Sequence, residues 1–188
     1  SYTISGNFDA ALEILVNNKS YKNPVELQKI SYLKAVKTYQ SGNYNGAILH
    51  FERAIKVNER SDFVAAALYW KGRSLYELNR YDDALDIFKK FKKSNSYKKI
   101  KEAFRVDYDI AYTYFKLGEY EYAFRFFESF LKQKGKETSN YDYDIKLRMG
   151  DCQFALKKYW SAMEFYNNAL ALNPKNAVYA SYQKAISY

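Results

Sequence analysis

Aromatic and small apolar residues recur along the chain at fixed offsets, in four segments that align without internal gaps. These segments are residues 35–47, 72–84, 111–123 and 150–162. Each begins with Ala or Gly and ends twelve residues later with Ala. A Tyr precedes the closing Ala by three residues, and another aromatic residue follows it by four. Because positions three and four residues apart share one face of a helix, the pattern predicts helices packed through aromatic side chains.

Partial copies of the pattern lie at both ends of the chain. Gly6, Phe8, Ala11 and Leu15 match the second half of a copy, and residues 181–188 parallel residues 31–39. The chain is therefore expected to begin in mid-repeat and to stop after a single helix, as a piece of a longer protein. The periodicity and the turn signals predict ten helices, over about 7–18, 25–41, 43–58, 62–78, 80–93, 100–117, 119–134, 141–157, 159–172 and 175–188.

The recurring small residues have two different roles. Gly72 and Gly150 open their segments, where a small side chain allows two helix backbones to approach closely. Gly6, Gly42 and Gly118 lie near predicted turns, where glycine accepts the left-handed backbone that ends a helix.

Together these anchors resemble the tetratricopeptide repeat (TPR) family over essentially the whole chain, and Pro174 fits the proline that follows the second helix in that family. The resemblance implies an all-α fold, a right-handed α-solenoid of about ten helices in a single array over residues 1–188. The expected division is 1–24 as the second half of a repeat, 25–60, 61–99, 100–139 and 140–174 as repeats, and 175–188 as the first helix of a further repeat.

The sequence departs from the family pattern in three ways. In one of them, the large apolar residue before the first small anchor is replaced by Lys34, Lys71 and Lys184. A third small anchor is replaced in the middle repeats by Phe91 and Phe130, so we expect looser or re-angled packing there. The first anchors fall at 35, 72, 111, 150 and 185, in steps of 37, 39, 39 and 35 residues, whereas the family repeat has about 34. This stretched spacing resembles TPR arrays of bacterial cell-envelope proteins. The envelope or periplasm is therefore the expected location, and the cytoplasm is the alternative.

Composition excludes several kinds of site. The 188 residues include one Cys and one His, which excludes an internal disulfide and a cysteine-based zinc site and argues against a histidine cluster. The longest apolar run, residues 63–70, is too short to cross a membrane. No phosphate loop or nucleophile elbow occurs. The acidic residues in 107–109 and 142–144 are spaced by two and are expected to point to different helix faces. We therefore predict a non-enzymatic protein without a cofactor or metal.

Recognition residues are expected on the first helix of each hairpin, because in TPR proteins one stripe of that helix lines the concave groove. Positions that hardly vary between repeats usually pack, and variable positions carry specificity. Tyr, Trp and Arg also dominate protein interfaces. The predicted groove residues for a peptide or protein partner are Tyr69, Trp70, Arg73, Arg105, Tyr108, Asp109, Tyr112, Arg148 and Asp151.

Other functions compete with groove binding. Chaperone-binding TPR domains hold a carboxylate with Lys and Asn where this chain has Tyr32 and Val36, which argues against a chaperone-tail function.

One alternative to groove binding is binding of an anionic surface or nucleic acid. Residues 89–101 contain seven Lys and no acid, and Lys132, Lys134 and Lys136 follow the next repeat. Another is self-association through open repeat ends. The net charge of +9 allows the first alternative without requiring it.

Overall fold

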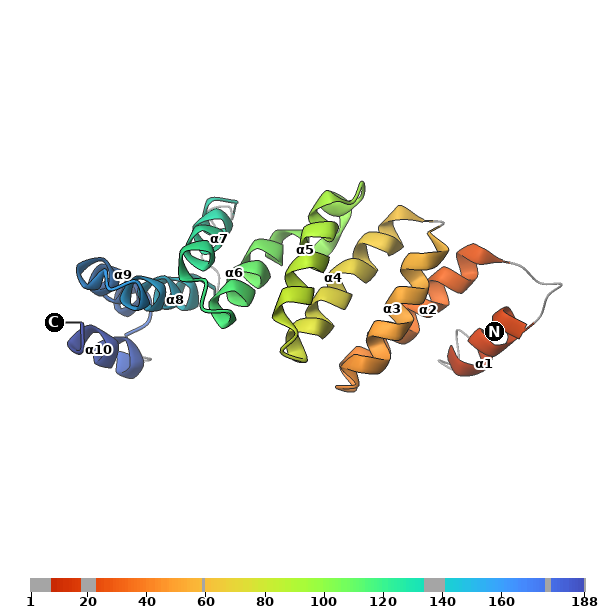
Figure 1. Cartoon of the computed structure of the whole chain (residues 1–188), viewed down its shortest axis with the longest axis horizontal. Coiled ribbons are helices and arrows are strands. Elements are labelled where there is room, and N and C mark those ends of the chain that lie inside the picture. The colour runs from red at the N-terminus through yellow and green to blue at the C-terminus, as the bar shows by residue number, and fades with distance from the viewer. Residues whose placement is uncertain (1–7, 18–22, 59, 134–140, 175–176, 188) are drawn as a thin grey trace. The chain divides into compact units, whose positions relative to one another are not determined.

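The computed structural model describes residues 8–17, 23–58, 60–133, 141–174 and 177–187, and these residues form ten α-helices and no strand (Figure 1). Two 3-10 segments, η1 (Tyr97–Lys99) and η2 (Lys101–Arg105), precede the sixth helix. The helices are α1 Phe8–Asn17, α2 Pro24–Gln40, α3 Tyr44–Val57, α4 Ser61–Glu77, α5 Tyr81–Lys93, α6 Val106–Lys116, α7 Tyr120–Gln133, α8 Tyr141–Ala155, α9 Tyr159–Leu172 and α10 Ala177–Ala185.

The chain divides into two compact units, residues 1–106 and 107–188. In the first unit α2 packs on α3, α3 on α4, and α4 on α5. In the second unit α7 packs on α8, α8 on α9, and α9 on α10. Within each unit these helices therefore pack on their neighbours in sequence.

The predicted all-α class and the predicted helices are confirmed in the described residues, with one difference. The helix expected over 100–117 begins as 3-10 structure, and its α-helical part starts at Val106. The amide of Ala103 donates to the carbonyl of Ile100 at 3.0 Å, three residues back. Such tighter turns are common at helix starts, and hydrophobic spacing alone does not reveal them. The expected repeat boundaries stay predictions.

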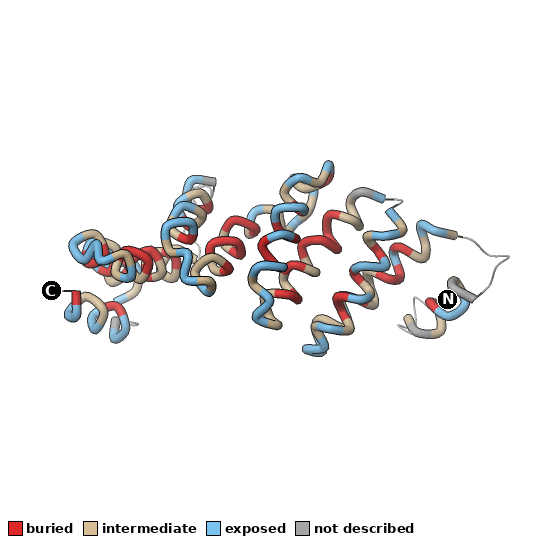
Figure 2. The backbone as a smooth tube through the Cα atoms, viewed as in Figure 1, coloured by how far each residue is buried: buried red, intermediate tan, exposed pale blue. Residues whose placement is uncertain are grey.

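Each hairpin is closed by a buried ring that lies on a small residue of the preceding helix. The anchors Ala35 and Ala111 are fully buried. A Cβ atom added to Gly72 would lie 2.7 Å from the Phe88 ring, and one added to Gly150 would lie 2.5 Å from the Tyr166 ring. In these two hairpins the ring therefore occupies the space of a methyl group. Figure 2 shows the buried residues along the paired helices and the turns between them exposed.

The two oversized third anchors are buried rather than left in a loose interface. Phe91 is 0% exposed and packs edge-on against Tyr97 of η1, with ring centroids 5.2 Å apart. Phe130 is 2% exposed and packs in the same way against Tyr141 at 5.6 Å. Tyr97 lies in one stretched link, and Tyr141 comes directly after the other. A second ring is therefore supplied in or next to each link where the family pattern has a small anchor.

The four hairpin turns share one left-handed position. It is Gly42 (φ 80°), Asn79 (φ 59°), Gly118 (φ 78°) and Lys157 (φ 59°). In each turn the next amide donates to the carbonyl five residues back, as Lys158 does to Gln153 at 2.9 Å, which is the hydrogen bond of a Schellman motif. Gly and Asn tolerate this backbone, whereas a Lys side chain is strained by about 1 kcal/mol.

We expect exchanges at the shared turn position to have opposite effects. Lys157→Gly should raise the free energy of unfolding by about 0.5–1 kcal/mol, because relief of strain exceeds the added entropy of the unfolded chain. Gly118→Ala should lower it by about 1 kcal/mol, since a Cβ there meets no atom within 4 Å and only the backbone conformation is strained. Urea denaturation monitored by circular dichroism measures both, and a less stable Lys157→Gly variant would contradict the assignment of strain.

Candidate partner-binding site

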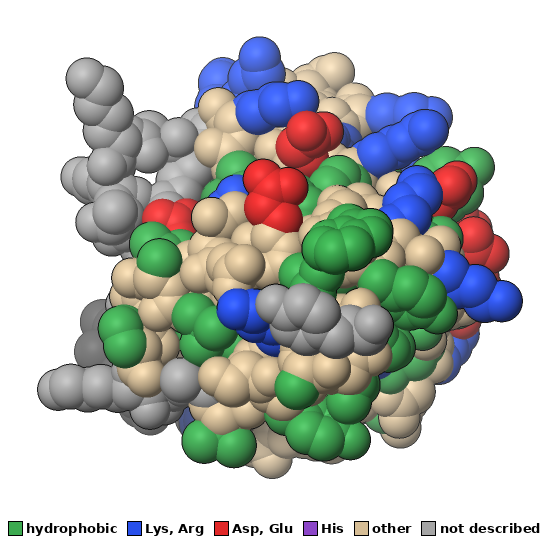
Figure 3. All heavy atoms as spheres, turned by 90° about the vertical axis from the view of Figure 1, so that its left-hand side faces the viewer, with side chains coloured by type: hydrophobic (Ala, Val, Ile, Leu, Met, Phe, Trp, Pro, Cys, Tyr) green, Lys and Arg blue, Asp and Glu red, His purple; other side chains and the backbone are tan. Residues whose placement is uncertain are grey.

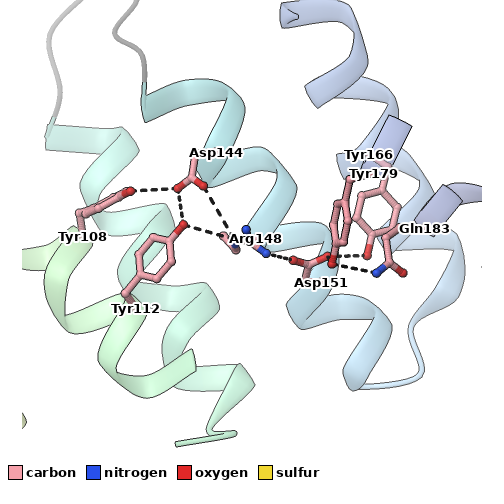
Figure 4. Close-up of polar contacts among 8 residues, drawn as sticks. All are labelled: Tyr108, Tyr112, Asp144, Arg148, Asp151, Tyr166, Tyr179 and Gln183. Atoms are coloured by element: carbon pink, nitrogen blue, oxygen red, sulfur yellow. Dashed lines mark hydrogen bonds and ion pairs between the residues drawn. The ribbon is translucent and has the colours of Figure 1, made fainter. Parts of the chain in front are cut away.

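A guanidinium held between two carboxylates lies on the first helices of the second unit (Figure 4). Arg148 of α8 donates from Nη1 to Oδ2 of Asp151 at 2.7 Å and from Nε to the hydroxyl of Tyr112 at 3.2 Å. Oδ1 of Asp144, one turn earlier on α8, lies 3.8 Å from the same Nε. The two carboxylates orient the guanidinium and balance its charge.

Asp144 joins α8 to α6. Its Oδ2 accepts hydrogen bonds from the hydroxyls of Tyr108 at 3.0 Å and Tyr112 at 2.5 Å. The two tyrosines lie one turn apart on α6, so both hydroxyls reach the same oxygen. Burial, and next the Asp144 carboxylate, raise the pKa of Tyr112 well above its ordinary value. The Tyr112 hydroxyl therefore stays protonated and acts as a donor.

Asp151 joins α8 to α9 and α10. Its Oδ1 accepts from the hydroxyl of Tyr166 at 3.0 Å and from that of Tyr179 at 3.2 Å. The amide of Gln183 donates to the Tyr179 hydroxyl at 2.8 Å. Burial raises the pKa of Asp151, and Arg148 and the hydroxyls oppose that shift. The carboxylate is thus 9% exposed and has partners on both oxygens.

Part of the Arg148 side chain faces solvent. Its side chain is 28% exposed, and its Cζ lies 5.8 Å from the ring centre of Phe115 and 5.9 Å from that of Tyr179. Among the described residues, Nη2 has no hydrogen-bond partner. The site therefore presents charged N–H donors flanked by aromatic rings, which suits recognition of carbonyl oxygens.

A smaller cluster occupies the first helices of the first unit. Arg73 pairs with Glu77 at 2.8 Å, and its Cζ lies 5.5 Å from the ring centre of Tyr76. Trp70 packs edge-on against Tyr39, with centroids 5.1 Å apart. Arg73 and Trp70 are half-buried. This cluster combines a charged donor with ring surface, but it contains one carboxylate instead of two.

Comparisons with known proteins agree on the fold. Sequence models described as tetratricopeptide repeat match residues 32–98, 105–133 and 143–176. The chain belongs to the tetratricopeptide repeat family. The predicted α-solenoid of TPR hairpins is thereby confirmed as the fold class. The comparison with curated proteins gives no match.

Several solved TPR structures have a similar fold. A crystal structure of MamA has a TM-score of 0.70 at 17% identity, covering 86% of this chain and 80% of that chain. MamA from Desulfovibrio magneticus RS-1 has a TM-score of 0.67 at 16% identity, covering 85% and 88%. The first TPR domain of Spaghetti (RPAP3), bound to the HSP90 peptide SRMEEVD, has a TM-score of 0.52 at 23% identity, covering 65% and 89%.

The structure brings only some of the predicted groove residues together. Tyr69 and Asp109 are each 2% exposed, and they leave no side-chain surface for a partner. Burial of the Tyr69 ring against Phe88 and Phe91 explains its loss from the candidate set. Arg105 lies half-buried in η2. The remaining candidates divide between the units, with Trp70 and Arg73 in the first and Tyr108, Tyr112, Arg148 and Asp151 in the second.

Sequence reasoning missed four members of the cluster in the second unit: Asp144, Tyr166, Tyr179 and Gln183. We expected the acidic residues in 142–144 to point to different helix faces, which left Asp144 out of the candidate set, yet Asp144 alone meets Arg148 on its own helix and two hydroxyls from α6. The sequence did contain a signal for Tyr166. Four residues after the closing Ala, the other three repeats have Phe and this repeat has Tyr, and Asp151 lies in the same repeat.

The single His and the single Cys lie outside this cluster of hydroxyls and charges. Burial, and next the charges of Lys34 and Arg53, lower the pKa of His50 to about 4. Cys152 is buried, and burial followed by the Asp151 charge raises the pKa of its thiol to about 12. Within the described ranges, no group of three or more His, Cys, Asp or Glu could hold a metal, and no helix is long and apolar enough to cross a membrane.

The surfaces behind the two alternatives are formed by residues outside the cluster. In residues 89–101, Lys90, Lys92 and Lys93 occupy the last turn of α5, where their charge favours the helix dipole. Lys89 also lies in α5, and Lys98, Lys99 and Lys101 lie in η1 and η2. Lys132 is exposed, and Lys134 and Lys136 lie outside the described residues. On α10, Val178 and Tyr182 are 84% and 62% exposed, which is the surface that self-association requires.

The His50 imidazole gives a pH signature. Its folded pKa of about 4 lies below the ordinary 6.5, so its contribution to stability is complete above 6.5 and is lost as pH falls toward 4. Because the chain has one His, a single ring resonance in NMR should titrate near pH 4. His50→Gln should flatten the pH dependence of unfolding in that window. A ring that titrates near 6.5 would contradict the burial.

The hydroxyl of Tyr166 offers a direct test of the cluster. Tyr166→Phe keeps the ring that the other repeats use but leaves Asp151 short of a donor, so the free energy of unfolding should fall by about 1–2 kcal/mol. The loss should be much smaller in an Asp151→Ala background, because the partner is already absent. Equal losses in the two backgrounds would show that the hydrogen bond contributes nothing.

Proposed function

We propose that this TPR array is a protein-interaction scaffold that binds an extended peptide or a partner helix along the first helices of its hairpins. In the second unit the binding surface would be formed by α6, α8 and α10. The observation that carries the proposal is Arg148, which two carboxylates hold in place while its side chain stays 28% exposed and its Nη2 has no partner among the described residues. Arg and Tyr in such positions are the residues that most often dominate protein interfaces.

The charge balance favours a partner's backbone carbonyl over a carboxylate. Arg148 carries one positive charge, and Asp144 and Asp151 carry two negative charges within 4 Å of it. A carboxylate tail would meet a net negative site, whereas a neutral carbonyl would accept from Nη2 without repulsion. The Phe115 and Tyr179 rings beside the guanidinium supply apolar contact for the partner's side chains. The HSP90 peptide bound to the Spaghetti TPR domain supports peptide binding in general, not an acidic tail here.

Substitution of Arg148 tests the proposal. Affinity capture from a lysate of the source cells should retain a partner on the native chain and deplete it at least tenfold on Arg148→Leu, since loss of an interface anchor costs about 2 kcal/mol or more. Arg148→Lys should also deplete it, because the charge stays but the planar fork is lost.

Arg80→Leu is the matched control, because Arg80 forms only an exposed ion pair with Asp83 and should leave capture unchanged. Circular dichroism of each variant separates lost binding from lost structure. If folded Arg148→Leu captures the same proteins in the same amounts as the native chain, the site does not lie on these helices. Fractionating the source cells into soluble and envelope parts tests the further proposal, drawn from the stretched repeat spacing, that the partner belongs to an envelope assembly.

A further inference from the structure

The tip of the fourth hairpin differs in chemistry from the other three tips. Here Lys157 and Lys158 lead into Trp160 at the start of α9, and Trp160 is 81% exposed. With Met163 and Ser187, these residues line an open hollow of about 490 Å³. Figure 3 looks onto this end of the second unit and shows hydrophobic side chains at the surface beside Lys and Arg.

The second residue of α9 departs from the pattern of the equivalent helices. That position holds Asn45 in α3, Asp82 in α5 and Glu121 in α7, which suit a helix N-terminus because its dipole favours negative charge or a hydrogen-bond acceptor. Trp160 offers neither and leaves a large ring in water. An exposed ring of this size has no structural role that the other three tips share.

The two lysines depart from the pattern as well. Lys157 occupies the left-handed turn position that Gly or Asn holds elsewhere. Lys158 precedes α9, where a cation opposes the helix dipole. Arg80 holds the same place before α5, but Asp83 neutralises it at 2.7 Å, whereas α9 has Ser161 at the matching position. Three local rules are thus broken within four residues, which is typical of surfaces kept for binding.

The charge of the residues that line the hollow favours a negatively charged ligand. Its lining, among the residues that the structure describes, includes two lysines and no carboxylate. Both lysines are exposed, and neither forms an ion pair with a described residue. A partner that brings carboxylates would neutralise them, and a large aliphatic side chain would cover the exposed Trp160 ring. Two lysines are fewer than the four to eight that usually hold a protein on an anionic membrane.

We infer that the tip of the fourth hairpin, residues 157–160, is a second interaction surface, which binds an acidic protein segment carrying a large aliphatic side chain. This surface is separate from the proposed groove, because none of the residues that line the hollow belongs to the Arg148 cluster. The array would therefore contact a partner, or two partners, on two surfaces of one unit.

Fluorescence of Trp160 provides the test. Trp70→Phe leaves Trp160 as the single tryptophan of the full chain. The probe is the peptide acetyl-Glu-Asp-Leu-Ile-Glu-Asp-amide, with acetyl-Lys-Lys-Leu-Ile-Lys-Lys-amide as the charge-reversed control. The acidic peptide should give a saturable blue shift and protect Trp160 from acrylamide quenching, and the basic peptide should do neither. Lys158→Gln and Lys157→Gly should each weaken binding at least fivefold.

Lys157→Gly is the sharpest variant because it should weaken binding while relieving backbone strain, so misfolding cannot explain the loss. Arg148→Leu should leave peptide affinity within twofold, which separates this surface from the groove. The inference is overturned if the acidic peptide gives no saturable shift, if both peptides bind alike, or if the lysine variants bind as the parent does. A shift with vesicles of phosphatidylcholine and phosphatidylglycerol at 3:1, without a peptide response, would overturn it in favour of a lipid surface.

Discussion

The close approach of one ring to one small residue in each hairpin is the constraint on which the rest of this molecule depends. Gly72 meets Phe88, and Gly150 meets Tyr166, at distances that leave no space for a side chain on the glycine. This packing brings two helices together and also fixes where the ring ends. In the fourth repeat the ring carries a hydroxyl, so the same contact places a donor on Asp151. The candidate site is thus built directly on the packing of its hairpin.

The stretched links show how packing tolerates a departure from the family pattern. Phe91 and Phe130 replace small anchors, and the residues that follow in the links provide Tyr97 and Tyr141 to cover them. Longer links and larger anchors therefore belong together.

The fold was readable from the sequence because five anchor types recur at fixed offsets, and each has a local physical reason. The site was readable only in part. Periodicity placed Arg148, Asp151 and Tyr112 on the first helices, but it does not give depth, so it ranked buried Tyr69 and Asp109 with exposed residues. Asp144 was missed because the two hydroxyls that bind it lie more than thirty residues away on α6. Side-chain networks between helices depend on how each helix is rotated about its axis relative to its neighbours. A linear pattern of residues does not contain that information.

The single thiol of the chain gains a practical meaning from its position. Cys152 lies on α8 beside Asp151, fully buried, with a pKa of about 12. Alkylating reagents attack thiolates that solvent can reach. In the folded fourth hairpin the sulfur is protected in two ways, because solvent does not reach it and because the thiol stays protonated. Reaction at Cys152 therefore requires α8 to separate from its neighbours. The rate of alkylation therefore measures how often the fourth repeat opens. It reports on this repeat by itself, because the repeats of an array need not open together.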